Sequence, residues 1–291
     1  MGPATLLERV SARVRNSEYL TRIGVEVCGV ADGEANARLA WLADNANRAG
    51  SVHGGVLASA LLAAAELAAA STERTSNAVD ARISSVSITF QRAARACDAD
   101  VLARVLDRGR DVVHVFAECG NASNTFARAL IAVRITGTGE DDASASMARA
   151  DIPLAGGHEL AGSAYMRAAG AEIVECSGEW SGMTMPVGPN DDGSGRVHPG
   201  AIAGLIDTCG ALSAYARLGA QSRGRGATVS LSIAYGAVSP GSVCGAARLG
   251  RNDGNGFIAD AEAWNPATRR VFAIGLVFYR IPLERDRGAT S

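Results

Sequence analysis

VHGGVLASALLAAAELAAA over residues 52–70 closely matches VHPGAIAGLIDTCGALSAY over residues 197–215. This match decides the fold. Each begins with Val-His and a turn that contains glycine, and each continues as a long apolar run. His53 and His198 are 145 positions apart, about half the length of this 291-residue chain. Similarity at a fixed distance of this size indicates an internal repeat, so we expect two copies of one domain.

The match continues downstream of these two segments. VSITF over residues 86–90 corresponds to VSLSI over residues 229–233, and the last β-prone stretches, 127–135 and 271–281, keep nearly the same spacing. Between the copies the sequence is rich in Gly, Ser, Ala and acidic residues, which is the composition of a linker. We therefore predict a first unit over 1–137, a linker over 138–157, a second unit over 158–284 and a tail over 285–291.

Both copies predict the same set of elements. In the first copy, an amphipathic helix at residues 5–15 precedes two strands around a turn at 31–34, and the long helix and four more strands follow. Because the long helix is apolar on nearly every face, other elements must surround it. The sequence therefore predicts an α+β fold in which an antiparallel sheet wraps a central helix, once in each copy.

Composition excludes several classes of protein. Hydrophobic residues make up 47% of the chain and charged residues 20%, which is typical of a globular protein. The net charge is only -2 and no basic run resembles a nucleic-acid site, so we expect no nucleic-acid partner. The sequence has no signal-peptide core and no uninterrupted apolar stretch of about 20 residues, so we expect a cytoplasmic protein that does not bind membranes. The six cysteines form no CxxC pair, which argues against a zinc or dithiol site.

The turn that opens the first long helix carries a specific motif. Asn47, Gly50, His53, Gly54 and Gly55 fit the pattern Asn-x-x-Gly-x-x-His-Gly-Gly. In this motif the chain resembles the hotdog-fold thioesterases, in particular the phenylacetate-pathway and 4-hydroxybenzoyl-CoA thioesterases. The resemblance implies a tandem (double) hotdog fold, an acyl-CoA substrate, no cofactor or metal, and assembly of double-hotdog chains into a homo-oligomer.

The family motif also has an acidic residue nine positions after the His, and the two copies differ there. The first copy has Leu62 at this position, whereas the second copy has Asp207. The second copy in turn replaces the Asn of the motif by Asp192 and the first helix glycine by Pro199. Each copy therefore keeps half of the pattern.

In similar proteins the site lies between two hotdog units, with the carbonyl-binding groups from one unit and the carboxylate from the other. The resemblance thus places Asn47, His53 and Gly54 opposite Asp207 in one composite site, with Gly55 beside the substrate. The reciprocal combination of Asp192, Pro199 and Leu62 should be inactive.

Thioester hydrolysis explains why these residue types suit a site. Negative charge develops on the carbonyl oxygen in the transition state, so N–H donors aimed at that oxygen lower the barrier. Gly54 opens the long helix, where the first backbone N–H groups have no intrahelical acceptor and the helix dipole is positive. Pro199 has no N–H and cannot act in this way. Asn47 is either a second donor, through its amide, or a turn-forming residue.

Asp207 is a carboxylate on a helix made mostly of Ala, Ile, Leu and Gly, where burying a charge is costly unless the charge has a partner or a function. We expect it to act as a general base on water or as a nucleophile. The family often carries a Ser or Thr on the strand after the helix. Thr228 falls at that place, where the first copy has Ile83.

The two histidines of the repeat occur in both copies, although each copy keeps only half of the site. We interpret His53 and His198 mainly as residues that fix the turn by local hydrogen bonds, with His53 also beside the substrate. Glu66 lies one helical turn after Leu62 on the same face of the helix, so a second site at Glu66 and His198 is a further hypothesis.

Two other functions stay open at this stage. A hotdog hydratase or dehydratase acting on acyl thioesters would use His198 and Asp207 as an acid–base pair. A non-catalytic acyl-CoA binding protein would have lost both sites. Because the losses in the two copies are complementary and spare one composite site, we predict an acyl-CoA thioesterase.

Overall fold

A computed structural model of the chain describes residues 4–73, 78–137, 163–176, 180–218, 226–236, 240–252 and 256–281. The linker predicted over 138–157 and the tail predicted over 285–291 lie outside these ranges. The first unit begins with α1, Leu6–Asn16, whose start is fixed by a capping box between Thr5 and Glu8. The elements that follow are α2 Glu18–Arg22, β1 Val25–Ala31, β2 Glu34–Leu39, η1 Ala43–Asn45, α3 Gly54–Ser71, β3 Ala78–Phe90, β4 Ala99–Arg108, β5 Val112–Asn121 and β6 Asn124–Gly137.

The second unit repeats this order from α2 onward. Its elements are α4 Ala164–Ala168, β7 Glu172–Cys176, β8 Trp180–Met185, η2 Gly188–Asn190, α5 Pro199–Leu218, β9 Ala227–Tyr235, β10 Val243–Asn252, β11 Gly256–Trp264 and β12 Val271–Arg280. Its first two strands, β7 and β8, pair with each other as β1 and β2 do in the first unit. The predicted duplication is therefore present in three dimensions.

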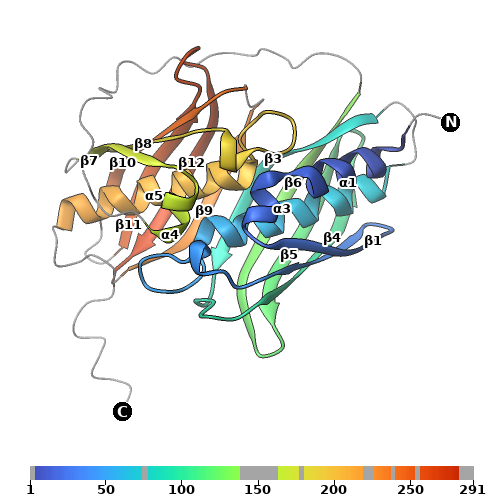
Figure 1. The fold of residues 1–291 in the computed structure, drawn as a ribbon, viewed down its shortest axis with the longest axis horizontal. Coiled ribbons are helices and arrows are strands. Elements are labelled where there is room, and N and C mark those ends of the chain that lie inside the picture. Colours follow the sequence, from blue (N-terminus) through green and yellow to red (C-terminus); the bar gives the residue numbers. More distant parts are fainter. Residues whose placement is uncertain are drawn as a thin grey trace.

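The twelve strands of the described residues form one antiparallel sheet in the order β1-β2-β4-β5-β6-β3-β9-β12-β11-β10-β8-β7 (Figure 1). The two six-stranded halves join where β3 pairs with β9. In that pair Ser87 lies opposite Ser232, and their hydroxyls are 3.3 Å apart. These residues are 145 positions apart, so a pseudo-two-fold axis passes through the sheet between them.

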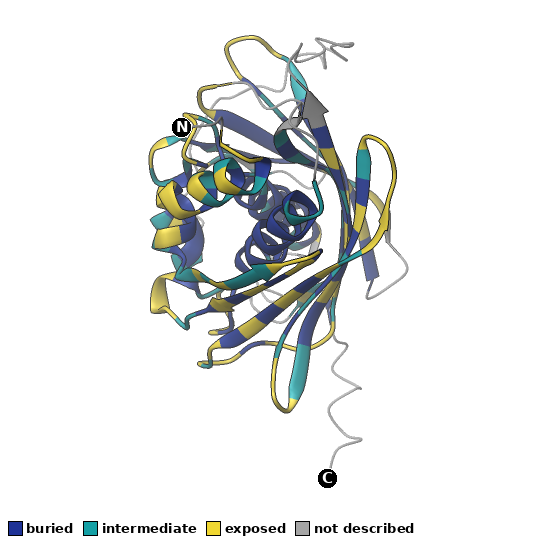
Figure 2. Ribbon diagram, turned by 90° about the vertical axis from the view of Figure 1, so that its right-hand side faces the viewer, coloured by how far each residue is buried: buried dark blue, intermediate teal, exposed yellow. Residues whose placement is uncertain are grey.

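The two long helices lie together on one side of the sheet, which curves around them (Figure 2). Small residues let them approach closely, because a β-carbon added at Gly55 would lie 2.4 Å from Cα of Gly204. The equivalent contact joins Gly200 to Ser59. α3 is long and apolar enough to cross a membrane, yet nearly all of its residues are buried inside this fold. The structure thus confirms two central helices wrapped by antiparallel sheet.

Candidate active site

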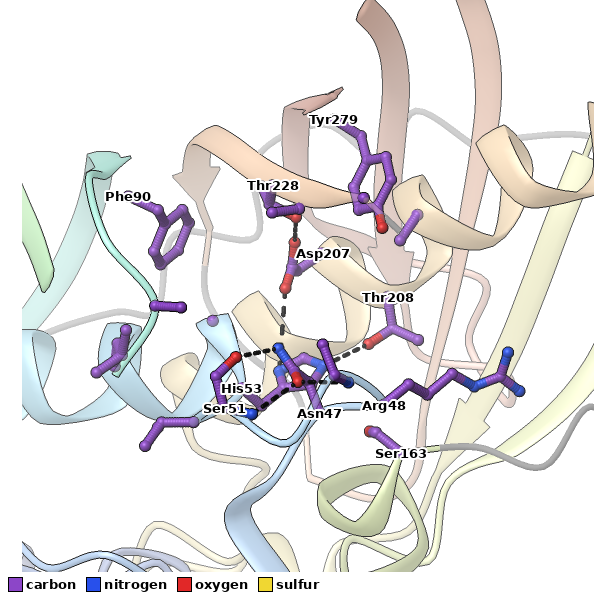
Figure 3. A pocket seen from close by; sticks show the side chains of 18 of the residues that line it. Asn47, Arg48, Ser51, His53, Phe90, Ser163, Asp207, Thr208, Thr228 and Tyr279 are labelled. Atoms are coloured by element: carbon purple, nitrogen blue, oxygen red, sulfur yellow. Dashed lines mark hydrogen bonds and ion pairs between the residues drawn. The ribbon is translucent and has the colours of Figure 1, made fainter. Parts of the chain in front are cut away.

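A cavity of about 240 Å³ opens at the boundary between the two units (Figure 3). The first unit contributes the loop before α3, the first turn of α3 and the end of β3. The second unit contributes one face of α5 together with β7, β8 and the start of β9. The residues named from the sequence that line this cavity are Asn47, His53, Gly54, Asp207 and Thr228.

Asp207 lies on α5 with only 5% of its surface exposed. Its Oδ1 accepts a hydrogen bond of 2.5 Å from the Thr228 hydroxyl, so one carboxylate oxygen is held in place. Its Oδ2 faces the start of α3, where a β-carbon added at Gly54 would lie 2.9 Å away. Burial raises the pKa of the Asp207 carboxyl to about 6, and the Thr228 hydrogen bond opposes that rise. The carboxylate is therefore unusually basic and remains largely ionised at neutral pH.

Gly54 is the first residue of α3, so its N–H is among those that have no acceptor within the helix. Among the hydrogen bonds of the described residues, none uses this N–H. An added β-carbon would meet Asp207 on one side and the ring of Phe90, at 3.2 Å, on the other. Glycine at this position keeps open both the N–H and the space in front of the carboxylate.

His53 is held by hydrogen bonds on both ring nitrogens. Its Nδ1 accepts the backbone N–H of Gly55 at 3.0 Å, which caps α3. Its Nε2 lies 3.2 Å from the hydroxyl of Thr208, and that hydroxyl donates to the carbonyl of Gly204. The imidazole must then donate through Nε2, which makes it neutral. Burial also lowers the pKa of His53 to about 4, so its geometry suits the turn-fixing role rather than that of a base.

Asn47 lies on the cavity wall within a turn that it stabilises itself. Its Oδ1 accepts the backbone N–H groups of Ala49 and Ser51 at 2.9 and 3.1 Å. Its amide nitrogen donates to the Ser51 hydroxyl at 2.8 Å. These three hydrogen bonds all stabilise the turn, as the turn-forming interpretation of Asn47 predicts. The second N–H of the Asn47 amide remains available to a substrate atom.

Gly55, expected beside the substrate, lies elsewhere. It is fully buried, its N–H is bonded to His53, and its Cα packs against Gly204 where α3 and α5 meet. The glycine is required because any side chain would force these helices apart. Gly55 therefore shapes the contact between the units and does not line the cavity.

The reciprocal position contains a network of ion pairs instead of a second site. Glu66 forms an ion pair of 2.9 Å with Arg13 of α1, and the other terminal nitrogen of Arg13 lies 2.7 Å from Asp80. Asp192 forms an ion pair of 3.0 Å with Arg82. With its carboxylate committed to Arg13, Glu66 is not available as a second catalytic carboxylate.

His198 has a structural role and does not provide a base for a second site. Its Nδ1 accepts the backbone N–H of Gly200 at 3.0 Å, as His53 does in the first unit. Burial lowers the pKa of His198 to about 3, although the nearby Asp192 opposes this change. The residue caps α5 and stays neutral.

The register of the repeat explains why only one position is open. Glu66 corresponds to Ala211, and Arg82 corresponds to Ala227, each pair 145 positions apart. Ala211 and Ala227 both line the cavity. The long charged side chains of Glu66 and Arg82 fill the reciprocal position. Ala211 and Ala227 have only methyl groups at the equivalent places, so the cavity beside Asp207 stays open. Sequence reasoning missed this contrast, although aligning the two copies residue by residue would have revealed it.

Other lining residues carried no signal in the sequence. Ile173, Met183 and Leu212 give one wall an apolar surface. Tyr215 and Tyr279 form another wall, and their hydroxyls are hydrogen-bonded to each other. No motif spacing marks these five positions, because they come from separate strands and from the far end of α5.

Within the described ranges, no group of three or more His, Cys, Asp and Glu is arranged to hold a metal ion. The six cysteines are all free thiols. Burial raises the pKa of the Cys119 thiol to about 12, so this thiol is protonated and unreactive.

Comparison with known proteins adds a family match over part of the chain and a fold. Residues 42–138 match the family model described as the acyl-CoA thioesterase N-terminal domain. This range contains the motif around His53 and the whole of α3. No curated protein matches the sequence significantly.

Three solved structures share the architecture over nearly the whole chain. A conserved hot dog fold protein of unknown function from Alicyclobacillus acidocaldarius is 15% identical, with a TM-score of 0.68, and covers 91% of this chain and 98% of its own. The tesB protein of Mycobacterium avium subs paratuberculosis is 16% identical, with a TM-score of 0.62 and coverages of 95% and 100%. Acyl-CoA thioesterase II TesB2 of Mycobacterium marinum is 13% identical, with a TM-score of 0.61 and coverages of 89% and 95%. At these identities the likeness establishes the double hotdog fold.

Proposed function

We propose that this chain, which belongs to the hotdog-fold thioesterases and carries their acyl-CoA thioesterase domain over residues 42–138, hydrolyses acyl-CoA thioesters at the one composite site between its units. The observation that carries this proposal is the contact between Gly54 and Asp207. A free helix-terminal N–H and a basic carboxylate come from different copies of the repeat and meet at one cavity. These are the two groups that hydrolysis of a thioester requires.

In the proposed reaction, the thioester carbonyl oxygen accepts the N–H of Gly54 at the positive end of α3. Oδ2 of Asp207 removes a proton from a water molecule while the water oxygen bonds to the carbonyl carbon. The resulting oxyanion is stabilised by the Gly54 N–H. When it collapses, the carbon–sulfur bond breaks, and the proton held by Asp207 passes to the departing thiolate. The products are a free acid and coenzyme A.

The rest of the cavity supports a division between acyl and CoA ends. Ile173, Met183 and Leu212 offer an apolar surface to the acyl group. Arg48 and Arg92 lie on the lining at exposed positions, where a guanidinium is suited to bind the phosphates of CoA.

The geometry does not favour a hydratase that uses His198 and Asp207 as an acid–base pair. His198 directly precedes α5 and Asp207 follows nine positions later, which separates them by about 13 Å along the helix axis. Moreover, Nδ1 of His198 already accepts the N–H of Gly200. By contrast, Nδ1 of His53 lies 3.9 Å from Oδ2 of Asp207.

The test is release of free thiol from a panel of short, medium, long and aromatic acyl-CoAs by the wild-type protein and by Asp207→Asn. Asp44→Asn, a substitution at an exposed aspartate outside the cavity, is the matched control. We expect release by the wild type and by the control, and a loss on the order of 100-fold or more in Asp207→Asn. A wild-type protein that releases no thiol from any substrate, or an Asp207→Asn variant as active as the control, would refute the proposal.

A single turnover in ¹⁸O-labelled water separates a general base from a nucleophile. If Asp207 activates water, the label enters the acid product and not the protein. If Asp207 attacks the thioester, coenzyme A leaves and a mixed anhydride joins the acyl group to Asp207. Water that attacks the Asp207 carboxyl carbon of this anhydride leaves label on the protein, so label found on Asp207 by mass spectrometry of the peptide identifies a nucleophile.

A further inference from the structure

The imidazole of His53 lies between two polar groups of α5, the carboxylate of Asp207 and the hydroxyl of Thr208 (Figure 3). Its Nδ1 is 3.9 Å from Oδ2 of Asp207, and its Nε2 is 3.2 Å from the Thr208 hydroxyl. The ring is buried and packs on the ring of Tyr165, with the centroids 4.6 Å apart. Because packing fixes the ring, the position of its single proton decides how it interacts with the carboxylate.

Thr208 determines which nitrogen of His53 carries that proton. The Thr208 hydroxyl donates to the carbonyl of Gly204, one helical turn earlier, at 2.8 Å, so toward His53 it acts as an acceptor. Nε2 of His53 therefore donates, and Nδ1 keeps the lone pair that accepts the N–H of Gly55 at 3.0 Å. A neutral imidazole has one N–H, so Nδ1 cannot donate to Asp207 in this state.

The opposite tautomer of His53 would disable the base. With the proton on Nδ1, the imidazole would release the N–H of Gly55 and would point a donor at Oδ2 of Asp207. An approach of about 1 Å would then complete a hydrogen bond between Nδ1 and Oδ2. A hydrogen bond to the ionised carboxylate favours that form and makes it a weaker base. Oδ1 already accepts the hydroxyl of Thr228, so both carboxylate oxygens would be occupied.

The internal repeat shows that the Thr208 hydroxyl is not required to cap a helix. His198, the counterpart of His53, accepts the N–H of Gly200 at 3.0 Å in the same way. The position 145 residues before Thr208 is Ala63, which has no hydroxyl. The hydroxyl is therefore present in the copy whose helix also carries the carboxylate, and it is absent from the copy whose helix has leucine at that place.

We propose that Thr208 is a positioning residue that holds the proton of His53 on Nε2 and thereby keeps Oδ2 of Asp207 available to a water molecule. This inference rests on the proposed hydrolysis, in which Oδ2 takes a proton from water. Thr208 acts through His53 and needs no contact with the substrate. Capping of α3 and basicity of the carboxylate then depend on the same tautomer.

The other titratable groups around Asp207 do not compete for this role. They are Tyr165 of α4, Cys209 of α5 and Tyr279 of β12, and burial raises the pKa of each. All three are therefore neutral at the pH of the reaction. Within the described ranges, Asp207 forms no ion pair with an arginine. His53 is the ionisable side chain whose proton position can alter the carboxylate.

Nitrogen NMR of the ¹⁵N-histidine-labelled protein tests the tautomer without any substrate. Protonated and unprotonated ring nitrogens have well-separated ¹⁵N shifts, and the signals of His53, one of four histidines, are those lost in His53→Gln. We expect the proton on Nε2 in the wild type and in Thr208→Ser, which keeps the hydroxyl. In Thr208→Val the proton should move to Nδ1. A wild type protonated on Nδ1, or a Thr208→Val variant still protonated on Nε2, would overturn the proposal.

The pH profile of thiol release tests the consequence for Asp207. In Thr208→Val, the acid limb of kcat/KM should move about one pH unit lower, and kcat should fall on the order of 10-fold, because Oδ2 accepts a hydrogen bond. Thr208→Ser should restore both values to within about twofold of wild type. Thr228→Val should shift the limb in the opposite direction, since Thr228 donates directly to Asp207. An acid limb unmoved in Thr208→Val would refute the positioning role.

Thr72→Val is the matched control. The hydroxyl of Thr72, at the end of α3, also donates to a carbonyl of its own helix, that of Ala69, and also accepts an N–H, from Arg108. It lies outside the cavity, so the pH profile and the His53 spectrum should both match wild type. A wild-type protein that releases no thiol would refute the proposed hydrolysis, whereas the ¹⁵N spectrum alone decides the tautomer.

Discussion

A β-carbon added at Gly54 would lie 2.9 Å from Oδ2 of Asp207, so the first residue of α3 and the carboxylate of α5 meet across the boundary between the two units. The partners come from opposite copies of the repeat. Any change at either residue is therefore expected to affect the reaction more than the fold.

Gly54→Ala should lower kcat on the order of 100-fold, because the new methyl group would displace the carboxylate and the ring of Phe90. The variant should still fold, since alanine favours a helix. Steady-state kinetics and circular dichroism would measure the two effects. Gly29→Ala is the matched control, because a β-carbon there meets nothing within 4 Å. Full activity in Gly54→Ala would show that the contact with Asp207 is not needed.

The pH dependence of the reaction should reflect the carboxyl of Asp207. Burial raises its pKa to about 6, and only the ionised form accepts a proton, so kcat/KM should rise with pH through about 6 and then level off. Thr228→Val removes the hydrogen bond that favours the ionised form. The rise should then move to higher pH. A profile unchanged by Thr228→Val would mean that the hydroxyl does not support the carboxylate.

The ionised carboxylate of Asp207 should also lower the free energy of unfolding. Its pKa is raised from 3.8 to about 6 in the folded state, so the ionised carboxylate disfavours folding once the pH exceeds the folded pKa. Asp207→Asn should therefore increase the free energy of unfolding at pH 8 by about 3 kcal/mol. The gain should vanish near pH 4, where the carboxyl is protonated in the folded protein. Urea unfolding at both pH values measures this, and a variant that is less stable at pH 8 would contradict it.

Glu66→Ala should affect stability and leave the reaction intact. It removes one of the carboxylates that compensate the buried guanidinium of Arg13, at a cost of about 3 kcal/mol. Thiol release per folded molecule should stay within about twofold of wild type, because Glu66 lies outside the cavity, whereas Asp207→Ala should abolish it. Glu118→Ala breaks an exposed pair with Arg128 and should cost less than about 1 kcal/mol. Equal loss of activity in Glu66→Ala and Asp207→Ala would refute a single working site.

The duplication, the central helices and the two complementary half-sites could be predicted from the residues alone, because these features depend on spacing along the chain. The positions of Gly54, Pro199, Leu62 and Asp207 follow from the repeat register alone. The roles of Gly55 and Arg13 became clear only from the packing of the two units. Gly55 proved to serve helix packing because it meets Gly204 of the other unit. Arg13 occupies the reciprocal position because α1 packs beside α3, a contact between segments 53 residues apart that no local pattern encodes. Packing brings together residues that are distant along the chain, and it alone determines which space is filled and which remains for a substrate.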